Sequence, residues 1–232
     1  ESWQRFIFHQ FHDDLTGTSI PRAYEFSWND ELLSLKQFSG ILTHAVKSVA
    51  HNLDTQVKGV PIVFYNASGF ETTDIVSIEI EAPHFPKEVT VYDEQGKKVN
   101  SQLVSYTDGN VQLLVEATVP AVGYVVYDVR LAGSGKEMAI TEATNIENSF
   151  YKLMLDENGD IVSLFDKKNN KELVKAGKAI RLALFTENES LSWPAWEVLK
   201  KTIDRTPISI TSNVKMTLCE NGELRKTLCV EK

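Results

Sequence analysis

The spacing of apolar residues changes near residue 55, from a helical period to the alternation typical of β-strands. Before that point one apolar stripe recurs every three or four residues, through Leu35, Phe38, Leu42, Ala45, Val49 and Leu53. This stripe predicts a helix over residues 28–53 that packs against partner helices. Ser27 is the expected N-cap, because Asp30 stands three residues later, where a capping box has an acidic or amide side chain.

A second helix is predicted over residues 3–12. Its apolar residues Trp3, Ile7 and Phe11 are spaced four apart. We expect this helix to end in the segment 15–21, because Gly17 and Pro21 both disfavour a continuing helix.

After residue 58 the chain alternates apolar and polar residues in short runs. The predicted strands cover residues 60–65, 74–81, 87–92, 99–106, 110–117 and 123–131. Asp108-Gly109 between two of them predicts a type I′ hairpin turn. Six short strands at this spacing are typical of a β-sandwich, and the glycine-rich residues 131–136 are interpreted as a linker.

A second β region follows. Asn158-Gly159 predicts a hairpin between strands 150–156 and 161–165, and Asn221-Gly222 predicts one between strands 208–218 and 224–230. A further strand is predicted over residues 178–185. Because the chain stops at a strand edge, we expect this region to continue in a longer protein.

The predicted class is therefore α+β, mostly β, in three parts. Residues 1–56 form a helical-bundle segment, 57–133 a small β-sandwich, and 134–232 the N-terminal part of a larger β-sandwich.

Composition narrows the possible functions. The chain has 232 residues, with 24 Lys and Arg against 32 Asp and Glu, so its formal net charge is −8. This balance argues against nucleic-acid partners. No apolar run approaches the roughly 18 residues of a membrane span, so no membrane partner is expected. Cys219 and Cys229 are too few for a disulfide framework and have no metal-ligand spacing.

The segment His9–Thr18 is the richest in candidate chemistry. It combines His9, His12, Asp13 and Asp14 with hydroxyl side chains and Gly17 within ten residues. Imidazole is a good zinc ligand, and a neighbouring carboxylate can accept a sugar hydroxyl. The alternative is a structural helix end. A zinc site needs about four ligands, and the others are not evident in this chain.

Other candidates are weaker. His44, His51 and His84 are interpreted as exposed or capping residues. The segment 193–197 contains Trp193 and Trp196, whose rings either anchor a sandwich edge or stack on sugars.

The segment 10–19, which reads Gln-Phe-His-Asp-Asp-Leu-Thr-Gly-Thr-Ser, resembles a motif of the glycoside hydrolase family 38 α-mannosidases. Further similarity lies in residues 23–25, 119–124, 146–148, 158–161, 165–168, 171–173 and 221–225. One position departs from the family pattern, because Pro194 stands where the family's Trp-Asp-Ala-Trp loop has an aspartate. We therefore assign no role to Trp193 or Trp196.

The resemblance implies a retaining, zinc-dependent glycosidase that cleaves terminal α-linked mannose from an α-mannoside or N-glycan-type oligosaccharide. It implies that His12 is a zinc ligand and that Asp13 hydrogen-bonds the mannose. His9 is expected to pack or to make an indirect contact. The catalytic carboxylates belong to a barrel that is absent here, so the implied partner is the N-terminal catalytic domain of the same protein. No catalytic residue is expected within this chain, which should be inactive alone.

Two other interpretations stay open. The β-sandwiches form an accessory carbohydrate-binding module that uses Trp193 and Trp196, or they are a structural module that braces a barrel.

Overall fold

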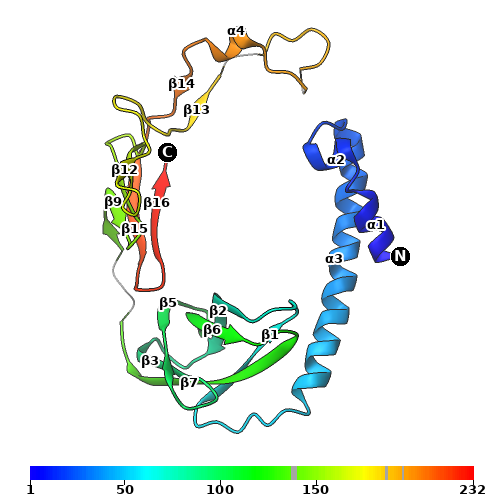
Figure 1. Ribbon diagram of the computed structural model, residues 1–232, viewed down its shortest axis with the longest axis vertical. Coiled ribbons are helices and arrows are strands. Elements are labelled where there is room, and N and C mark those ends of the chain that lie inside the picture. The colour runs from blue at the N-terminus through cyan, green and yellow to red at the C-terminus, as the bar shows by residue number, and fades with distance from the viewer. Residues whose placement is uncertain (137–139, 186–187, 195) are drawn as a thin grey trace. The chain divides into compact units, whose positions relative to one another are not determined.

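The computed structural model describes residues 1–136, 140–185, 188–194 and 196–232. The chain divides into two compact units. The first contains Glu1–Asp54 and Phe185–Pro207, and the second contains Thr55–Leu184 and Ile208–Lys232. A long helix precedes a succession of antiparallel sheets (Figure 1), which confirms the predicted class of mostly β structure with some helix. Among the described residues, no helix is both long enough and apolar enough to cross a membrane.

The chain begins with three helices, α1 (Ser2–Phe8), α2 (His12–Thr16) and α3 (Pro21–Ala50). The prediction of one helix over residues 3–12 was wrong. The amides of Gln10 and Phe11 bond to carbonyls only three residues back, which tightens the backbone into a turn after Phe8. His12 therefore begins a separate short helix.

The start of α3 also differs from the prediction. The helix begins at Pro21, because a proline at the first position has a suitable fixed φ and lacks only an N–H that would be unsatisfied there. Ser27 lies inside the helix and is not its N-cap. Its hydroxyl donates to the carboxylate of Asp14 at 2.9 Å and contacts the carbonyl of Ala23 at 3.1 Å.

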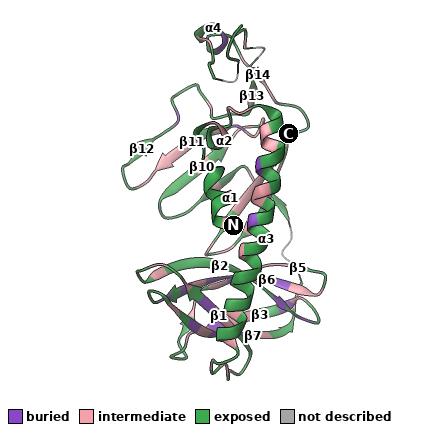
Figure 2. Cartoon of the chain, turned by 90° about the vertical axis from the view of Figure 1, so that its right-hand side faces the viewer, coloured by how far each residue is buried: buried purple, intermediate pink, exposed green. Residues whose placement is uncertain are grey.

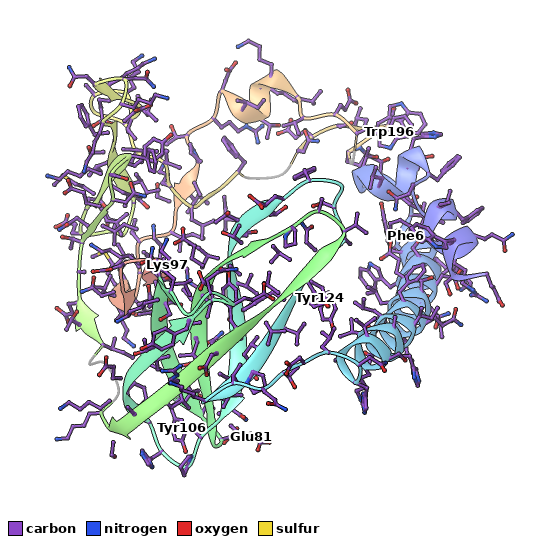
Figure 3. The ribbon with its side chains drawn as sticks, turned by 60° about the horizontal axis from the view of Figure 1, so that its bottom comes forward. Phe6, Glu81, Lys97, Tyr106, Tyr124 and Trp196 are labelled. Carbon is purple, nitrogen blue, oxygen red and sulfur yellow. The ribbon has the colours of Figure 1, made fainter. Side chains whose placement is uncertain are left out.

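The helices bury few of their residues. Figure 2 shows most of α3 exposed, and its buried residues are Ser27 and Ser34. Neither α1 nor α2 has a buried residue. The side chain of Phe6 lies beside α3 (Figure 3), in a groove that Trp3 and Phe38 also line. Polar bonds therefore contribute much of what holds α1 and α2 against α3.

Seven strands follow: β1 (Val60–Asn66), β2 (Thr72–Glu81), β3 (Pro86–Tyr92), β4 (Lys98–Val99), β5 (Ser101–Thr107), β6 (Asn110–Val119) and β7 (Gly123–Ser134). They form one sheet in the order β1-β7-β3-β4 and another in the order β2-β6-β5. Alternate residues of β6, including Val111, Leu113 and Val115, are fully buried in a core shared with the other sheet. Burial of each such side chain contributes about 1.5–3 kcal/mol.

The hairpin turn between β5 and β6 was predicted correctly. Asp108 and Gly109 have φ values of 52° and 82°, as a type I′ turn requires. At the same end of the sheet, the hydroxyl of Tyr106 donates to the carbonyl of Ala82 at 3.2 Å, and Figure 3 labels Tyr106 beside Glu81.

The linker predicted over residues 131–136 is largely a strand. β7 extends to Ser134, which pairs with Pro86, while Ala132 pairs with Glu88. Glycine is needed at residue 135 for close packing, because a Cβ there would lie 2.7 Å from the carbonyl oxygen of Pro86. Pairing with β3 therefore outweighs the low strand propensity of this segment.

The described residues of the second β region contain nine strands: β8 (Thr141–Glu142), β9 (Asn145–Glu147), β10 (Tyr151–Leu155), β11 (Ile161–Asp166), β12 (Lys171–Glu172), β13 (Ala183–Leu184), β14 (Ile208–Ser209), β15 (Lys215–Asn221) and β16 (Lys226–Glu231). Their sheet orders are β12-β11-β10-β9, β13-β14 and β16-β15-β8. The predicted hairpins β10–β11 and β15–β16 both form.

Two strands of this region were predicted too long. Only residues 183–184 of the expected strand 178–185 form a ladder, and the expected strand 208–218 is divided into β14 and β15. A four-residue helix, α4 (Lys200–Ile203), also interrupts the β structure. Alternation alone did not reveal these breaks, because a ladder also needs a partner strand in register.

Candidate functional site

The segment after α2 folds back on that helix. Gly17 ends α2 in the left-handed conformation with φ 82°, which glycine adopts without strain. The amides of Thr18 and Ser19 then donate to the carbonyl of Asp13 at 3.0 and 3.2 Å. The Gly-Thr-Ser sequence thus forms a turn that returns to the second residue of α2.

His12 is the first residue of α2, and its side chain is 76% exposed. Its Nε2 lies 3.4 Å from Oδ2 of Asp13, and its ring centroid lies 4.3 Å from that of Phe11. The imidazole and the carboxylate therefore form an accessible pair on a backbone held by the helix. The prediction that His12 lies at the end of a helix was wrong, because the chain turns after Phe8 and His12 begins α2.

Asp13 is partly exposed and is held by its neighbours. Its Oδ1 accepts a hydrogen bond from the hydroxyl of Thr18 at 3.2 Å. From α3, the hydroxyl of Tyr24 donates to the backbone carbonyl of Asp13 at 3.1 Å and accepts from the amide of Ser19 at 3.0 Å. Tyr24 therefore ties both ends of the turn to α3.

His9 is buried, with 5% of its surface exposed. Its Nδ1 lies 3.2 Å from Oδ2 of Asp14, and its Nε2 lies 3.3 Å from Oδ2 of Asp30. Burial by itself lowers the pKa of His9, but the hydrogen bonds to Asp14 and Asp30 outweigh that effect and raise the pKa above its ordinary value.

The two carboxylates have further partners. Asp14 accepts from Ser19 at 2.5 Å and from Ser27 at 2.9 Å, and Asp30 accepts from Arg5 at 2.5 Å. The bond from Ser19, with those from His9 and Ser27, lowers the pKa of Asp14. The hydrogen bond with His9 lowers the pKa of Asp30 most, and the hydrogen bond from Arg5 lowers it further. Both carboxylates are thus stabilised as anions.

The residues present match zinc in chemistry but not in number. An exposed imidazole beside a carboxylate is a suitable part of a zinc site. However, no group of three or more His, Cys, Asp or Glu side chains within the described residues could hold a metal ion. His12 and Asp13 provide at most two of about four ligands, so a complete site would need ligands from another segment.

The loop that contains Trp193 and Trp196 belongs to the same compact unit as α1, α2 and α3. Trp193 and Trp196 are about 60% exposed and stack with their ring centroids 5.7 Å apart. The indole N–H of Trp196 donates to the carbonyl of Thr18 at 3.5 Å. Ala195, between them in the predicted motif, lies outside the described residues. Two exposed rings are thus available for contact with a ligand.

A groove of about 680 Å³ lies in the second β region. The segment 146–153 and the turn of the β15–β16 hairpin line it, with Glu147, Asn148 and Arg225 among its polar side chains. Gln102, a buried residue of β5 in the sandwich, contacts the turn of this hairpin. Its side-chain oxygen accepts hydrogen bonds from the amides of Leu224 and Arg225 at 3.0 and 2.8 Å. The groove therefore has one wall fixed by the sandwich.

The contacts made by Tyr24, Ser27 and Asp30 were not predicted from the amino-acid sequence. Ser27 and Asp30 stood out only as helix-capping residues. A helix start at Pro21 would have placed Tyr24, Ser27 and Asp30 along one helix face, since residues three apart are neighbours. The proline was the available signal.

Two comparisons relate the chain to known proteins. Residues 146–232 match the model of the glycosyl hydrolases family 38 C-terminal domain. Over 96% of its length, the chain is 25% identical to alpha-mannosidase G of Dictyostelium discoideum. The chain spans 22% of the length of that relative. These findings confirm the resemblance to family 38, while His12 and Asp13 precede the residues that match the family model.

Proposed function

We propose that this chain is a segment of a retaining, zinc-dependent α-mannosidase that hydrolyses terminal α-linked mannose in α-mannosides or N-glycan-type oligosaccharides. In this proposal His12 supplies one zinc ligand and Asp13 accepts a hydrogen bond from a mannose hydroxyl. Bound zinc would act as a Lewis acid that orients sugar hydroxyls. The proposed domains remain residues 1–56, 57–133 and 134–232, joined to a catalytic barrel of the same protein.

The observation that carries the proposal is the exposed His12–Asp13 pair, 3.4 Å apart, in a chain that resembles family 38 over nearly its whole length. Tyr24 donates a hydrogen bond to the backbone carbonyl of Asp13, and Thr18 donates one to its carboxylate. Such support gives a ligand and a substrate contact a defined orientation.

Asp14 does not supply the chemistry of glycoside cleavage in this proposal. A retaining mechanism needs two carboxylates about 5–5.5 Å apart on either side of the sugar bond. The carboxylate of Asp14 is instead engaged by His9, Ser19 and Ser27. The nucleophile and the acid/base therefore belong to the barrel, and this chain alone is inactive.

The first test is activity. The isolated 232-residue chain should release no mannose from an aryl α-mannoside, with or without added zinc. Turnover that copurifies with this chain would contradict the proposal.

The second test is metal content. In the full-length enzyme, His12→Ala should lower zinc occupancy and abolish most activity while circular dichroism stays unchanged, because a catalytic zinc has few protein ligands. His9→Ala, which removes the other histidine of this segment, is measured beside it. If His9→Ala removes the zinc and His12→Ala does not, the assignment of His12 is wrong.

A second candidate function is sugar binding without catalysis. It is favoured by the exposed, stacked Trp193 and Trp196, since aromatic faces can stack on sugar rings. Binding of mannose oligosaccharides to the isolated chain, lost in Trp193→Ala and Trp196→Ala but kept in His12→Ala, would support this module. If the chain binds no sugar, this candidate is excluded.

A further inference from the structure

The surroundings of His9 are unusual for a histidine, because both of its ring nitrogens face hydrogen-bond acceptors. Each of its two ring nitrogens faces a carboxylate oxygen, Asp14 at 3.2 Å and Asp30 at 3.3 Å. An ionised carboxylate can only accept hydrogen bonds, whereas a neutral imidazole carries one N–H. A neutral His9 would therefore turn one nitrogen lone pair toward a carboxylate in a buried position. Only the imidazolium donates to both.

We infer that His9 is a buried imidazolium that bridges Asp14 to Asp30 and thereby positions the His12–Asp13 pair. The positioning role rests on the proposed function of that pair. His9 itself is not a catalytic residue, because it acts through Asp14 and the backbone of α2.

The path from His9 to the pair is short. Asp14 follows Asp13 directly, and its carboxylate also accepts from Ser19 and Ser27. α2 has only five residues, none of them buried, so no apolar core fixes its orientation. The bridge joins the turn after α1, through Asp14 of α2, to Asp30 of α3. Its loss would leave α2 held mainly by Tyr24 and Ser27.

Charged groups face the bridge from each helix. α1 contributes Arg5, which binds Asp30 at 2.5 Å and Glu1 at 2.8 Å. α2 contributes Asp14 and α3 contributes Asp30. The rings of Phe8 and His9 form a T-shaped pair, with ring centroids 5.3 Å apart. The positive charges of His9 and Arg5 thus balance the negative charges of Asp14 and Asp30. Glu1 contacts only Arg5 of this group. The raised pKa of His9 agrees with this balance.

The test is the ¹⁵N NMR spectrum of the histidine rings in the isotopically labelled 232-residue chain. We expect both ring nitrogens of His9 to have protonated shifts at pH 6.5, and its titration midpoint to lie above the ordinary value of about 6.5. Asp30→Asn should lower that midpoint. This variant keeps the shape of the side chain and removes one charge, so it preserves the fold.

The positioning role has its own measurement. His9→Gln should shift the backbone amide resonances of Asp13 and Gly17, and in wild type these resonances should follow the titration of His9. His12→Gln is the matched control, because it changes an exposed histidine of the same segment and should leave the His9 midpoint unchanged.

Three results would overturn the inference: a neutral ring at pH 6.5, a midpoint unaffected by Asp30→Asn, or amides of Asp13 and Gly17 that do not respond to His9. None of these measurements involves zinc or mannose. The inference about the bridge can therefore fail while His12 still proves to be the zinc ligand, and the reverse outcome is equally distinguishable.

Discussion

The hydroxyl of Tyr24 offers a direct test of how the candidate site is held. It donates to the carbonyl of Asp13 at 3.1 Å and accepts from the amide of Ser19 at 3.0 Å. Tyr24→Phe removes both bonds and leaves the ring in place. Because the side chain is half-buried, water can partly replace the hydroxyl.

The expected cost follows from that exposure. Two neutral hydrogen bonds contribute about 0.5–1.5 kcal/mol each, and replacement by water favours a total near the low end, about 1 kcal/mol. The amide of Ser19 also retains a longer bond to the carbonyl of Asp13, at 3.2 Å. A local loss of about 1 kcal/mol raises the population of the open turn about fivefold.

Amide hydrogen exchange measures this population. In Tyr24→Phe the Ser19 amide should exchange about fivefold faster, while amides in the sandwich keep their wild-type rates. Tyr127→Phe is the reciprocal control, because the hydroxyl of the buried Tyr127 accepts from the amide of Thr118 at 3.1 Å. That variant should change Thr118 and leave Ser19 unchanged. An unaltered exchange rate of the Ser19 amide in Tyr24→Phe would show that the hydroxyl of Tyr24 does not hold the turn.

Two further predictions concern stability and charge. Leu113 is fully buried in the sandwich core, so Leu113→Ala should lower the free energy of unfolding by about 3–5 kcal/mol in urea titrations. Thr118 is exposed on the same strand and shares a hydrogen bond with the hydroxyl of Thr73 at 2.9 Å, so Thr118→Ala should lower it by less than about 1 kcal/mol. A loss below about 1 kcal/mol for Leu113→Ala would contradict the assigned core. The side chains of Lys201 and Arg205 lower the pKa of Glu189 to about 2. Because this pKa is depressed in the folded state, the stabilising contribution is present above pH 4.5 and is lost as the pH falls toward 2. The carboxyl ¹³C resonance of Glu189 should titrate near 2, and a midpoint near 4.5 would show that the ion pairs do not form in solution.

The amino-acid sequence was sufficient for features that depend on neighbouring residues. The change of apolar period near residue 55 marked the passage from helix to strands, because each period corresponds to one backbone geometry. Asp108-Gly109 specified its own turn, since both residues tolerate positive φ. The match of residues 146–232 to the family 38 C-terminal domain agrees with the motifs of that region.

Other features were decided only when distant segments met. Residues 131–134 form a strand because β3 lies in register beside them, although their composition is that of a linker. Ser27 and Asp30 have the spacing of a helix cap, yet they bond to Asp14, His9 and Arg5 from the interior of α3. The sequence places His9 and His12 three residues apart with similar local surroundings. Only the tertiary structure buries His9 between two carboxylates and leaves His12 exposed, because burial and hydrogen-bond partners depend on which residues of α2 and α3 face each ring.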